Sequence, residues 1–453
     1  MKSIWKYSLL LVFLSILFWV GNGIQASIQP SISINGQLKE LSPPAMLKDN
    51  RTMVPVRFII EDDSLQGEVF WDSAQQKVAM NCRGKYIEFF IGQKTARVDG
   101  QSKNFDVAPY IHQDRTYIPL RFLAENLGAQ VSWNSLYRRA NIQFDYRPRV
   151  MAYYYYSSGQ ELKDSIKYCS DIAFRWYECN GQGHLNYEYK DDYASVLEYV
   201  RSHKVKTHAS VVLMDSNQLH QLLSSSTNRK LLIGNLMDEV KKYGYDGVNI
   251  DFEFIKSTDK NNFVTFLREL KTALGPDLEL SVAVFARTAK DSWPTGYDYV
   301  EIGKTADQVV VMAYDYHYPS SAAGPVAPLW WVGEVVDYMQ ACMPKEKILL
   351  GMPTYGYDWS SGGGAQSITA SKLAALKDKY KVSEHFDNES MSPYFTYWDE
   401  QGQSHQIWME NQKSLQSKLN TAIEAKVGGI SFWRIGNGFY DLYEVLDQSG
   451  YGA

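Results

Sequence analysis

Cysteine is scarce in this chain. Its 453 residues include four cysteines, and no two of them form a Cys-x-x-Cys pair. This excludes a scaffold held by disulfides and removes the usual signature of a zinc site. We expect buried thiols, and a pairing of Cys169 with Cys179 stays open because an oxidising compartment permits disulfides. The other two positions are Cys82 and Cys342.

An excess of positive charge is also missing. The chain has 46 Lys and Arg against 51 Asp and Glu, a net charge of −5. Nucleic acids and anionic membranes require a basic face, so both are excluded as partners. Aromatic residues, in contrast, make up 14% of the sequence. Most belong in a core, and exposed rings suit sugar surfaces.

The N-terminus holds one candidate membrane segment. Lys2 and Lys6 precede the apolar run 7–20, and small residues follow up to Ala26. This pattern predicts a secretory signal peptide over 1–26, and hence a secreted or cell-surface protein. The run is shorter than the ~20 residues of a spanning helix, and an uncleaved membrane anchor is the alternative.

Residues 27–145 contain an internal repeat. The motif at 50–58, NRTMVPVRF, returns at 114–122 as DRTYIPLRF, an offset of 64. Each copy has turn residues, an alternating apolar strand, and a short helix predicted from Arg57 or Arg121. We predict a module of two α+β units.

This module resembles the copper amine oxidase N-terminal-like modules on cell-surface proteins of spore-forming and related bacteria. Its single histidine is His112, whereas a copper centre needs several, so we expect no metal and no cofactor. The resemblance implies a stalk, a surface that contacts the cell wall, or a brace for the second domain.

From residue 149 onward, short apolar strands alternate with amphipathic helices. Parallel βα units give this pattern, and eight of them over 149–453 predict a closed (β/α)8 barrel. The segment 356–405 breaks the rhythm and predicts a small α+β insertion before the last strand. The expected strands are 150–156, 171–174, 207–213, 247–252, 279–285, 308–313, 348–352 and 429–433.

The fourth strand carries a column of polar side chains. Residues 246–253 read DGVNIDFE, and alternation places Asn249, Asp251 and Glu253 on one face. A buried carboxyl group costs several kcal/mol or takes up a proton, and a raised pKa is what a general acid needs. We expect Asp246 to serve in a turn.

Three strand ends together resemble glycoside hydrolase family 18, the chitinase and cell-wall glucosaminidase family. The fourth strand matches its Asp-x-x-Asp-x-Asp-x-Glu pattern at every fixed position except Asn249, the sixth contains Met312-Ala-Tyr314-Asp315, and the eighth ends at Trp433. The resemblance covers 149–453 and implies a retaining mechanism in which the 2-acetamido group of the substrate is the nucleophile.

The resemblance assigns roles to individual residues. Glu253 would be the acid and then the base, Asp251 would orient the acetamido group, and Tyr314 would donate to its oxygen. Trp433 would form the floor of the sugar site. Further substrate-binding positions are Asn249, Asp315, Tyr153 and Met312. His317 is expected to be an ordinary hydrogen-bonding loop residue.

Two departures from the family pattern bear on the substrate. Asn249 replaces a carboxylate, which should make the pKa of Asp251 less elevated, although the amide can still hydrogen-bond Asp251. The third strand lacks the Ser-x-Gly-Gly ending of chitinases. These features, with the sequences at 394–402 and 407–410, resemble the branch that acts on peptidoglycan.

We therefore expect a monomeric enzyme that cuts cell-wall or spore-cortex glycan after N-acetylglucosamine, with the module as a possible wall attachment. Chitin or chitooligosaccharide is the alternative substrate. Two readings of another class remain, a sugar-binding wall protein without turnover and a purely structural wall protein.

Overall fold

The computed structural model describes residues 29–34, 37–62, 65, 67–135, 137–144, 148–156, 158–187 and 192–449. The expected signal peptide at 1–26 lies outside these residues. The chain divides into two compact units, Met1–Trp133 with Tyr137–Asp145, and Asn134–Leu136 with Tyr146–Ala453. Within the described part of the chain, every helix is too short or too polar to cross a membrane.

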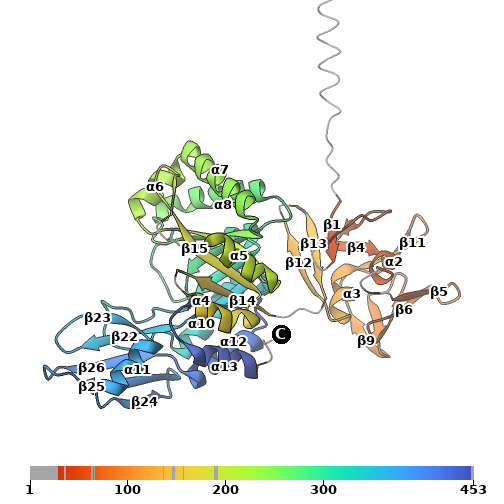
Figure 1. Ribbon diagram of the computed structural model, residues 1–453. Coiled ribbons are helices and arrows are strands. Elements are labelled where there is room, and N and C mark those ends of the chain that lie inside the picture. Colours follow the sequence, from red (N-terminus) through yellow and green to blue (C-terminus); the bar gives the residue numbers. More distant parts are fainter. Residues whose placement is uncertain are drawn as a thin grey trace, which may run out of the picture. The chain divides into compact units, whose positions relative to one another are not determined.

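The first unit is built from three sheets and the short helices α2 (Val56–Ile60) and α3 (Leu120–Asn126) (Figure 1). One sheet orders β10 (Tyr110–His112), β11 (Arg115–Pro119), β4 (Arg51–Pro55) and β3 (Met46–Lys48). Another orders β12 (Gln130–Asn134), β13 (Arg139–Gln143), β1 (Ser31–Ile34) and β2 (Gln37–Lys39). The third orders β5 (Glu68–Asp72), β6 (Lys77–Cys82), β7 (Lys85–Phe90), β8 (Thr95–Val98) and β9 (Gln101–Asn104).

The sequence repeat forms a symmetric pair of strands. β4 and β11 are antiparallel, with Val54 opposite Ile118, its own equivalent at an offset of 64. Pro55 and Pro119 end the two strands and lead into α2 and α3, since proline has no N–H to continue a ladder. The two copies are therefore related by an approximate twofold axis through this pair.

The second unit is a closed barrel of eight parallel strands, in which β14 pairs with both β15 and β27. This confirms the predicted fold. β16 (Leu185–Tyr187) adds antiparallel to β15. The barrel strands are β14 (Arg149–Tyr154), β15 (Asp171–Cys179), β17 (Lys206–Leu213), β18 (Gly247–Phe252), β19 (Glu279–Phe285), β20 (Gln308–Met312), β21 (Ile348–Pro353) and β27 (Gly429–Ile435).

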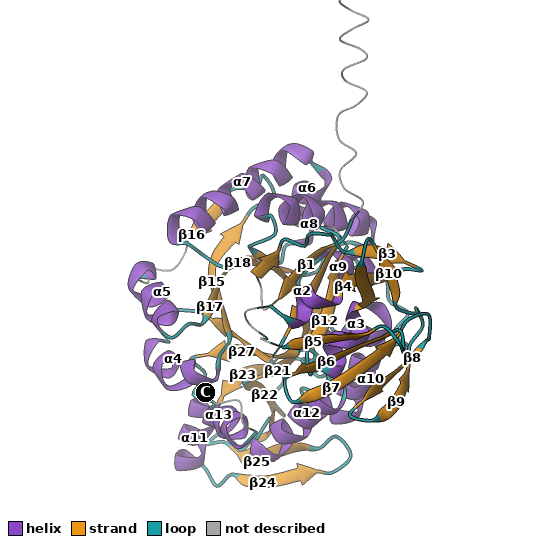
Figure 2. Cartoon of the chain, turned by 90° about the vertical axis from the view of Figure 1, so that its right-hand side faces the viewer, coloured by secondary structure: helices purple, strands orange, loops and turns teal. Residues whose placement is uncertain are grey.

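Helices surround the barrel, and α5 and α7 pack on the outer side of β17 (Figure 2). The set comprises α4 (Gly159–Ser165), α5 (Tyr193–Ser202), α6 (Ser216–Ser224), α7 (Ser226–Tyr243), α8 (Lys260–Leu274), α9 (Tyr299–Thr305), α10 (Leu329–Cys342), α12 (Gln412–Glu424) and α13 (Tyr440–Gln448). Short 3-10 turns are η1 (Ile166–Tyr168), η2 (Ser257–Asp259) and η3 (Lys345–Lys347). Sequence periodicity did not predict α4, α6, α9 and α13, which are seven to nine residues long.

The expected insertion is a five-stranded antiparallel sheet with one helix, drawn in blue in Figure 1. It extends slightly beyond the predicted range 356–405 at both ends. Its elements are β22 (Tyr355–Ser360), β23 (Ala365–Thr369), α11 (Ala370–Lys379), β24 (Ser383–Asp387), β25 (Ser392–Trp398) and β26 (Ser404–Met409).

Two expectations need correction. β15 continues five residues beyond the predicted end at Phe174, because its extension pairs with the short strand β16. All four cysteines are free, so Cys169 and Cys179 form no disulfide, and Cys342 is only half-buried.

Candidate active site

The polar column of β18 points into the barrel, while Val248, Ile250 and Phe252 pack in the outer core. Asn249 is fully buried, accepting from the Ser210 hydroxyl and donating to Ser281 Oγ, both at 2.9 Å. Among the described residues the Asn249 amide bonds serines on the two neighbouring strands, and the hydrogen bond to Asp251 that the sequence permits is not formed.

The next two acids of the column have raised pKa values. Burial raises the pKa of Asp251 to about 6, although the positive charge of Arg175 opposes this shift. Burial, together with the negative charges of Asp251 and Asp315, raises the pKa of Glu253 to about 8. These shifts favour the protonated form of Glu253 more strongly than that of Asp251.

The backbone around Glu253 is fixed on both sides. The Glu253 N–H donates to the Leu213 carbonyl at 3.0 Å, and the Tyr297 hydroxyl donates to the Phe252 carbonyl at 2.7 Å. The next residue, Phe254, has φ of 60°, which turns the chain sharply after the strand. These contacts set the direction of the Glu253 side chain.

Tyr314 and Asp315 follow β20 and face the two acids. Burial raises the pKa of Tyr314 well above its usual value, as do the charges of Asp251, Asp315 and Glu253. Asp315 accepts from the hydroxyls of Tyr355 and Tyr357 at 2.7 and 2.9 Å. These tyrosines lie on β22, so the insertion supplies part of the site.

Aromatic side chains complete this end of the barrel. The ring centroids of Tyr153 and Trp433 are 5.4 Å apart, and both residues belong with Met312 and Tyr314 to one interior cluster. Trp433 and Tyr314 also pack against the insertion, next to Trp408. The peptide bond between Trp433 and Arg434 is cis.

Three buried polar atoms near the site have no hydrogen-bond partner among the described residues. They are Asp251 Oδ1, the Tyr153 hydroxyl and Trp408 Nε1. Buried polar groups are normally paired, so these atoms are available to a ligand. An acceptor and donors of this kind match an acetamido group and sugar hydroxyls.

Sequence reasoning missed Arg175. This residue lies on β15, is 9% exposed, and pairs with Glu178 at 2.6 Å. The register of β15 against β17 shifts between Phe174 and Tyr177, so simple alternation does not predict which side chains face inward. The sequence signal that could have identified it is an arginine within an otherwise apolar strand.

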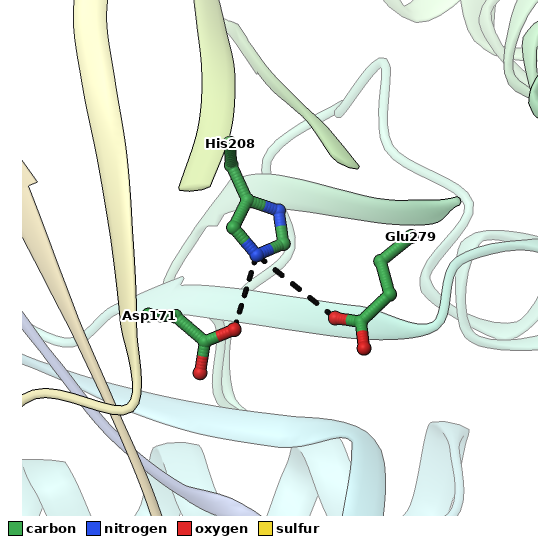
Figure 3. Close-up of side chains that lie close together, drawn as sticks. All are labelled: Asp171, His208 and Glu279. Atoms are coloured by element: carbon green, nitrogen blue, oxygen red, sulfur yellow. Dashed lines mark hydrogen bonds and ion pairs between the residues drawn. The ribbon is translucent and has the colours of Figure 1, made fainter. Parts of the chain in front are cut away.

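A second charged cluster lies at the opposite end of the barrel, where the strands begin. Asp171, His208 and Glu279 have ligand atoms within 4.8 Å of one another. Figure 3 shows the His208 ring between the two carboxylates. The Arg149 guanidinium donates to both carboxylates, and Lys206 pairs with Glu279. Because a guanidinium already lies between the acids, this cluster is a set of ion pairs that does not fit a metal.

Asp246 and His317 behave as the sequence predicted, and Lys256, a cation near Glu253 in sequence, makes its contact with another residue. Asp246 accepts from the Thr207 N–H and hydroxyl and is structural. His317 Nδ1 bonds the Ala322 carbonyl within its loop. Lys256 donates to Asn217, and no contact joins it to Glu253 among the described residues.

The barrel and its acids at the carboxyl end of the fourth strand define the class as a TIM-barrel hydrolase. Residues 149–438 match the family model of glycosyl hydrolases family 18, and the chain belongs to this family. Residues 33–142 match the copper amine oxidase N-terminal domain. Both predicted resemblances are confirmed.

Curated relatives include proteins of spore-forming bacteria. YdhD of Bacillus subtilis (strain 168), whose name describes a sporulation-specific glycosylase, is 30% identical over 345 residues, covering 72% of this chain and 81% of YdhD. The cortical fragment-lytic enzyme of Bacillus anthracis is 33% identical over 236 residues. That match covers 50% of this chain and 55% of the relative, so the chain spans about half the length of that enzyme.

Solved structures agree with this assignment. The spore cortex-lytic enzyme SleL of Bacillus cereus matches with a TM-score of 0.62 and 25% identity, covering 66% of this chain and 74% of SleL. A chitinase from Chromobacterium violaceum matches with a TM-score of 0.63 and 28% identity, covering 67% and 98%.

Proposed function

We propose that this glycoside hydrolase cleaves peptidoglycan after N-acetylglucosamine by substrate-assisted catalysis. The observation that carries the proposal is the placement of two acids, the buried Asp251 and the half-buried Glu253, side by side at the carboxyl end of β18, where burial and the charge of Asp251 raise the pKa of Glu253. Such a pair separates a proton donor from an ionised neighbour at one pH. One donor is enough when the substrate supplies the nucleophile.

In the first step, Glu253 gives its proton to the glycosidic oxygen as that bond breaks. The acetamido oxygen of the sugar attacks the anomeric carbon and forms a cyclic oxazolinium. Asp251 would accept the acetamido N–H and stabilise the positive charge that develops. Its Oδ1 atom, which lacks a partner among the described residues, is the acceptor available for this.

In the second step, Glu253 is a carboxylate and removes a proton from water as that water opens the oxazolinium. Two inversions give net retention at the anomeric carbon. Tyr314 would donate to the acetamido oxygen, and Trp433 would support the sugar ring. Tyr153, Asp315 and Met312 would complete the sugar site. Asn249 would support the site from inside the barrel through its hydrogen bonds to Ser210 and Ser281.

The substrate assignment draws on both the site and the relatives. The mechanism requires N-acetylhexosamine on the nonreducing side of the cleaved bond. The relatives named for sporulation and cortex favour spore or cell-wall glycan. The chitinase match favours chitooligosaccharide as the second candidate.

The proposed arrangement is a signal segment at 1–26, a module at 27–145 and a catalytic domain at 149–453. The enzyme would act as a monomer outside the cytoplasmic membrane, at the cell or spore wall. The module would provide the attachment to that wall.

The test is release of reducing ends from purified cortex, vegetative sacculi and chitooligosaccharides, with mass analysis of the new ends. We expect Glu253→Gln to reduce release by about 10²–10⁴-fold, the usual contribution of a general acid and base. Glu424→Gln, which changes an exposed acid on α12, is the matched control and should retain full activity. Binding of glycan without release by the wild type would instead identify a sugar-binding protein.

A further inference from the structure

A pocket of about 790 Å³ opens in the first unit, beside α2, β5 and the hairpin of β10 and β11. This volume falls within the roughly 300–1,000 Å³ of small-ligand sites. The lining residues include Trp71, which is 42% exposed, and the charged residues Arg57, Arg115 and Asp114. We refer to it as the Trp71 pocket.

The internal repeat provides a comparison for this pocket. Arg51 of the first copy forms an ion pair with Asp106 of the second. At the offset of 64, these residues correspond to Arg115 and Ser42, and both of the latter line the Trp71 pocket. Because Ser42 has no carboxylate, Arg115 has no ion pair within the part of the chain that the structure describes.

The two copies also differ in their aromatic residues, and the first copy lacks a contact that the second one has. Trp133, the equivalent of Trp71 at an offset of 62, packs against the core of the unit. Phe122, the equivalent of Phe58, lies 4.6 Å from Phe105 between ring centroids. Phe105 corresponds to Leu41, so the aromatic pair that fills one copy is missing from the other.

The other charges of the pocket are already matched. Arg57 pairs with Glu61, and Lys39 pairs with Asp62 at 2.7 Å. One cation, Arg115, and one anion, Asp114, remain beside the exposed indole. A polyanion would find little attraction here, whereas a neutral or singly charged ligand with hydroxyl and amide groups would find both donors and acceptors.

We infer that the Trp71 pocket binds a sugar unit of the N-acetylated glycan that the barrel hydrolyses. The indole face stacks on the apolar side of the sugar ring, and Arg115 and Asp114 bond its polar edge. The glycan class rests on the proposed function. Because both sites are on one chain, binding here raises the local concentration of substrate at the barrel.

The experiment measures co-sedimentation of the full chain with purified sacculi, in the Glu253→Gln background to stop turnover. We expect Trp71→Ala to weaken retention about tenfold, equivalent to about 1.4 kcal/mol, and Arg115→Ser to weaken it less. Trp71→Phe should restore most of the retention. Phe70→Ala is the matched control, because Phe70 is 50% exposed on the same strand and is not part of the pocket wall.

Hydrolysis of short soluble oligosaccharides separates this inference from the proposed function. With Glu253 intact, Trp71→Ala should leave that hydrolysis unchanged. Unchanged retention in both Trp71→Ala and Arg115→Ser would overturn the pocket assignment, even if the enzyme is active. Retention that depends on Trp71 in a chain that releases no reducing ends would support the pocket and contradict the proposed function. Circular dichroism of each variant excludes loss of folding as the cause.

Discussion

At the scale of single residues, the site depends on one cation among several acids. Arg175 lowers the pKa of both Asp251 and Glu253, against the effect of burial. Its charge is shared with Glu178, which accepts a hydrogen bond from it. Burial is the main cause of the raised pKa values, and Arg175 moves the pH range in which one acid is protonated and the other ionised back toward lower pH.

The pH profile tests this balance. The rate should fall above about pH 8, as Glu253 loses its proton, and below about pH 6, as Asp251 gains one. Because the two acids interact, the measured values belong to the pair. Arg175→Met removes a charge that favours the ionised forms, so both limbs of kcat/KM should move up by about one pH unit.

Glu178→Gln is the opposing variant. It removes the negative charge of the carboxylate that pairs with Arg175, so the pKa values of both acids should fall and both limbs should move to lower pH. Limbs that stay in place in both variants would contradict the assigned role of Arg175, provided that thermal unfolding shows both variants to be folded.

At the scale of elements, close packing of strands fixes the Tyr314 ring. Gly351 on β21 lies beside it, and a Cβ at this position would be 2.5 Å from the Val311 carbonyl oxygen and 3.1 Å from Tyr314 Cε1. The backbone contact is the closer of the two, so neither strand can easily move away. A glycine on one strand thus holds a site residue of the next.

We expect Gly351→Ala to destabilise the protein by about 1–3 kcal/mol and to lower kcat by displacing Tyr314. Gly234→Ala in α7 is the matched control, since its Cβ would meet nothing within 4 Å and would stabilise the helix by roughly 0.5–1 kcal/mol. Thermal unfolding and steady-state kinetics of both variants check this. A Gly351→Ala enzyme with normal kcat would show that Tyr314 does not depend on this packing.

The elements also show what sequence predicts and what it does not. The polar column of β18 could be predicted from the sequence because its side chains lie two residues apart on one strand. The sequence did not predict the contribution of Arg175, Tyr355 and Tyr357, because these residues reach the acids from another strand and from the insertion. The contacts of Asn249 depend on serines 39 and 32 residues away in sequence, and periodicity within one strand does not reveal them.

At the scale of the whole molecule, the two units have separate hydrophobic cores. The barrel also has the ion-pair cluster of Arg149, Asp171 and Glu279 at the start of its strands. Arg149 holds the pKa of Asp171 and Glu279 below their usual values. Such acids stabilise the fold at pH values above the unfolded pKa of about 4, and that contribution is lost as pH falls toward the folded values.

Calorimetry of the full chain should therefore show two transitions, one for each core. Arg149→Met should lower the stability of only one unit, by about 3–5 kcal/mol, because it removes the guanidinium from the buried Asp171 and leaves Lys206 as the cation of Glu279. Since the folded pKa of each acid then rises toward its unfolded value of about 4, the loss of stability on acidification should be smaller and should be complete at a higher pH. A single transition, or an equal shift of two, would contradict the independence of the cores.

The antiparallel pairing of β4 with β11, centred on Val54 and its own counterpart Ile118, has an evolutionary consequence. A single copy of this unit would present a strand complementary to itself, which is the interface of an isologous homodimer. Fusing two such protomers into one polypeptide makes their sequences independent. One half can then conserve the ancestral contacts while the other acquires a new ligand, a divergence that a homodimer encoded once is unable to reach.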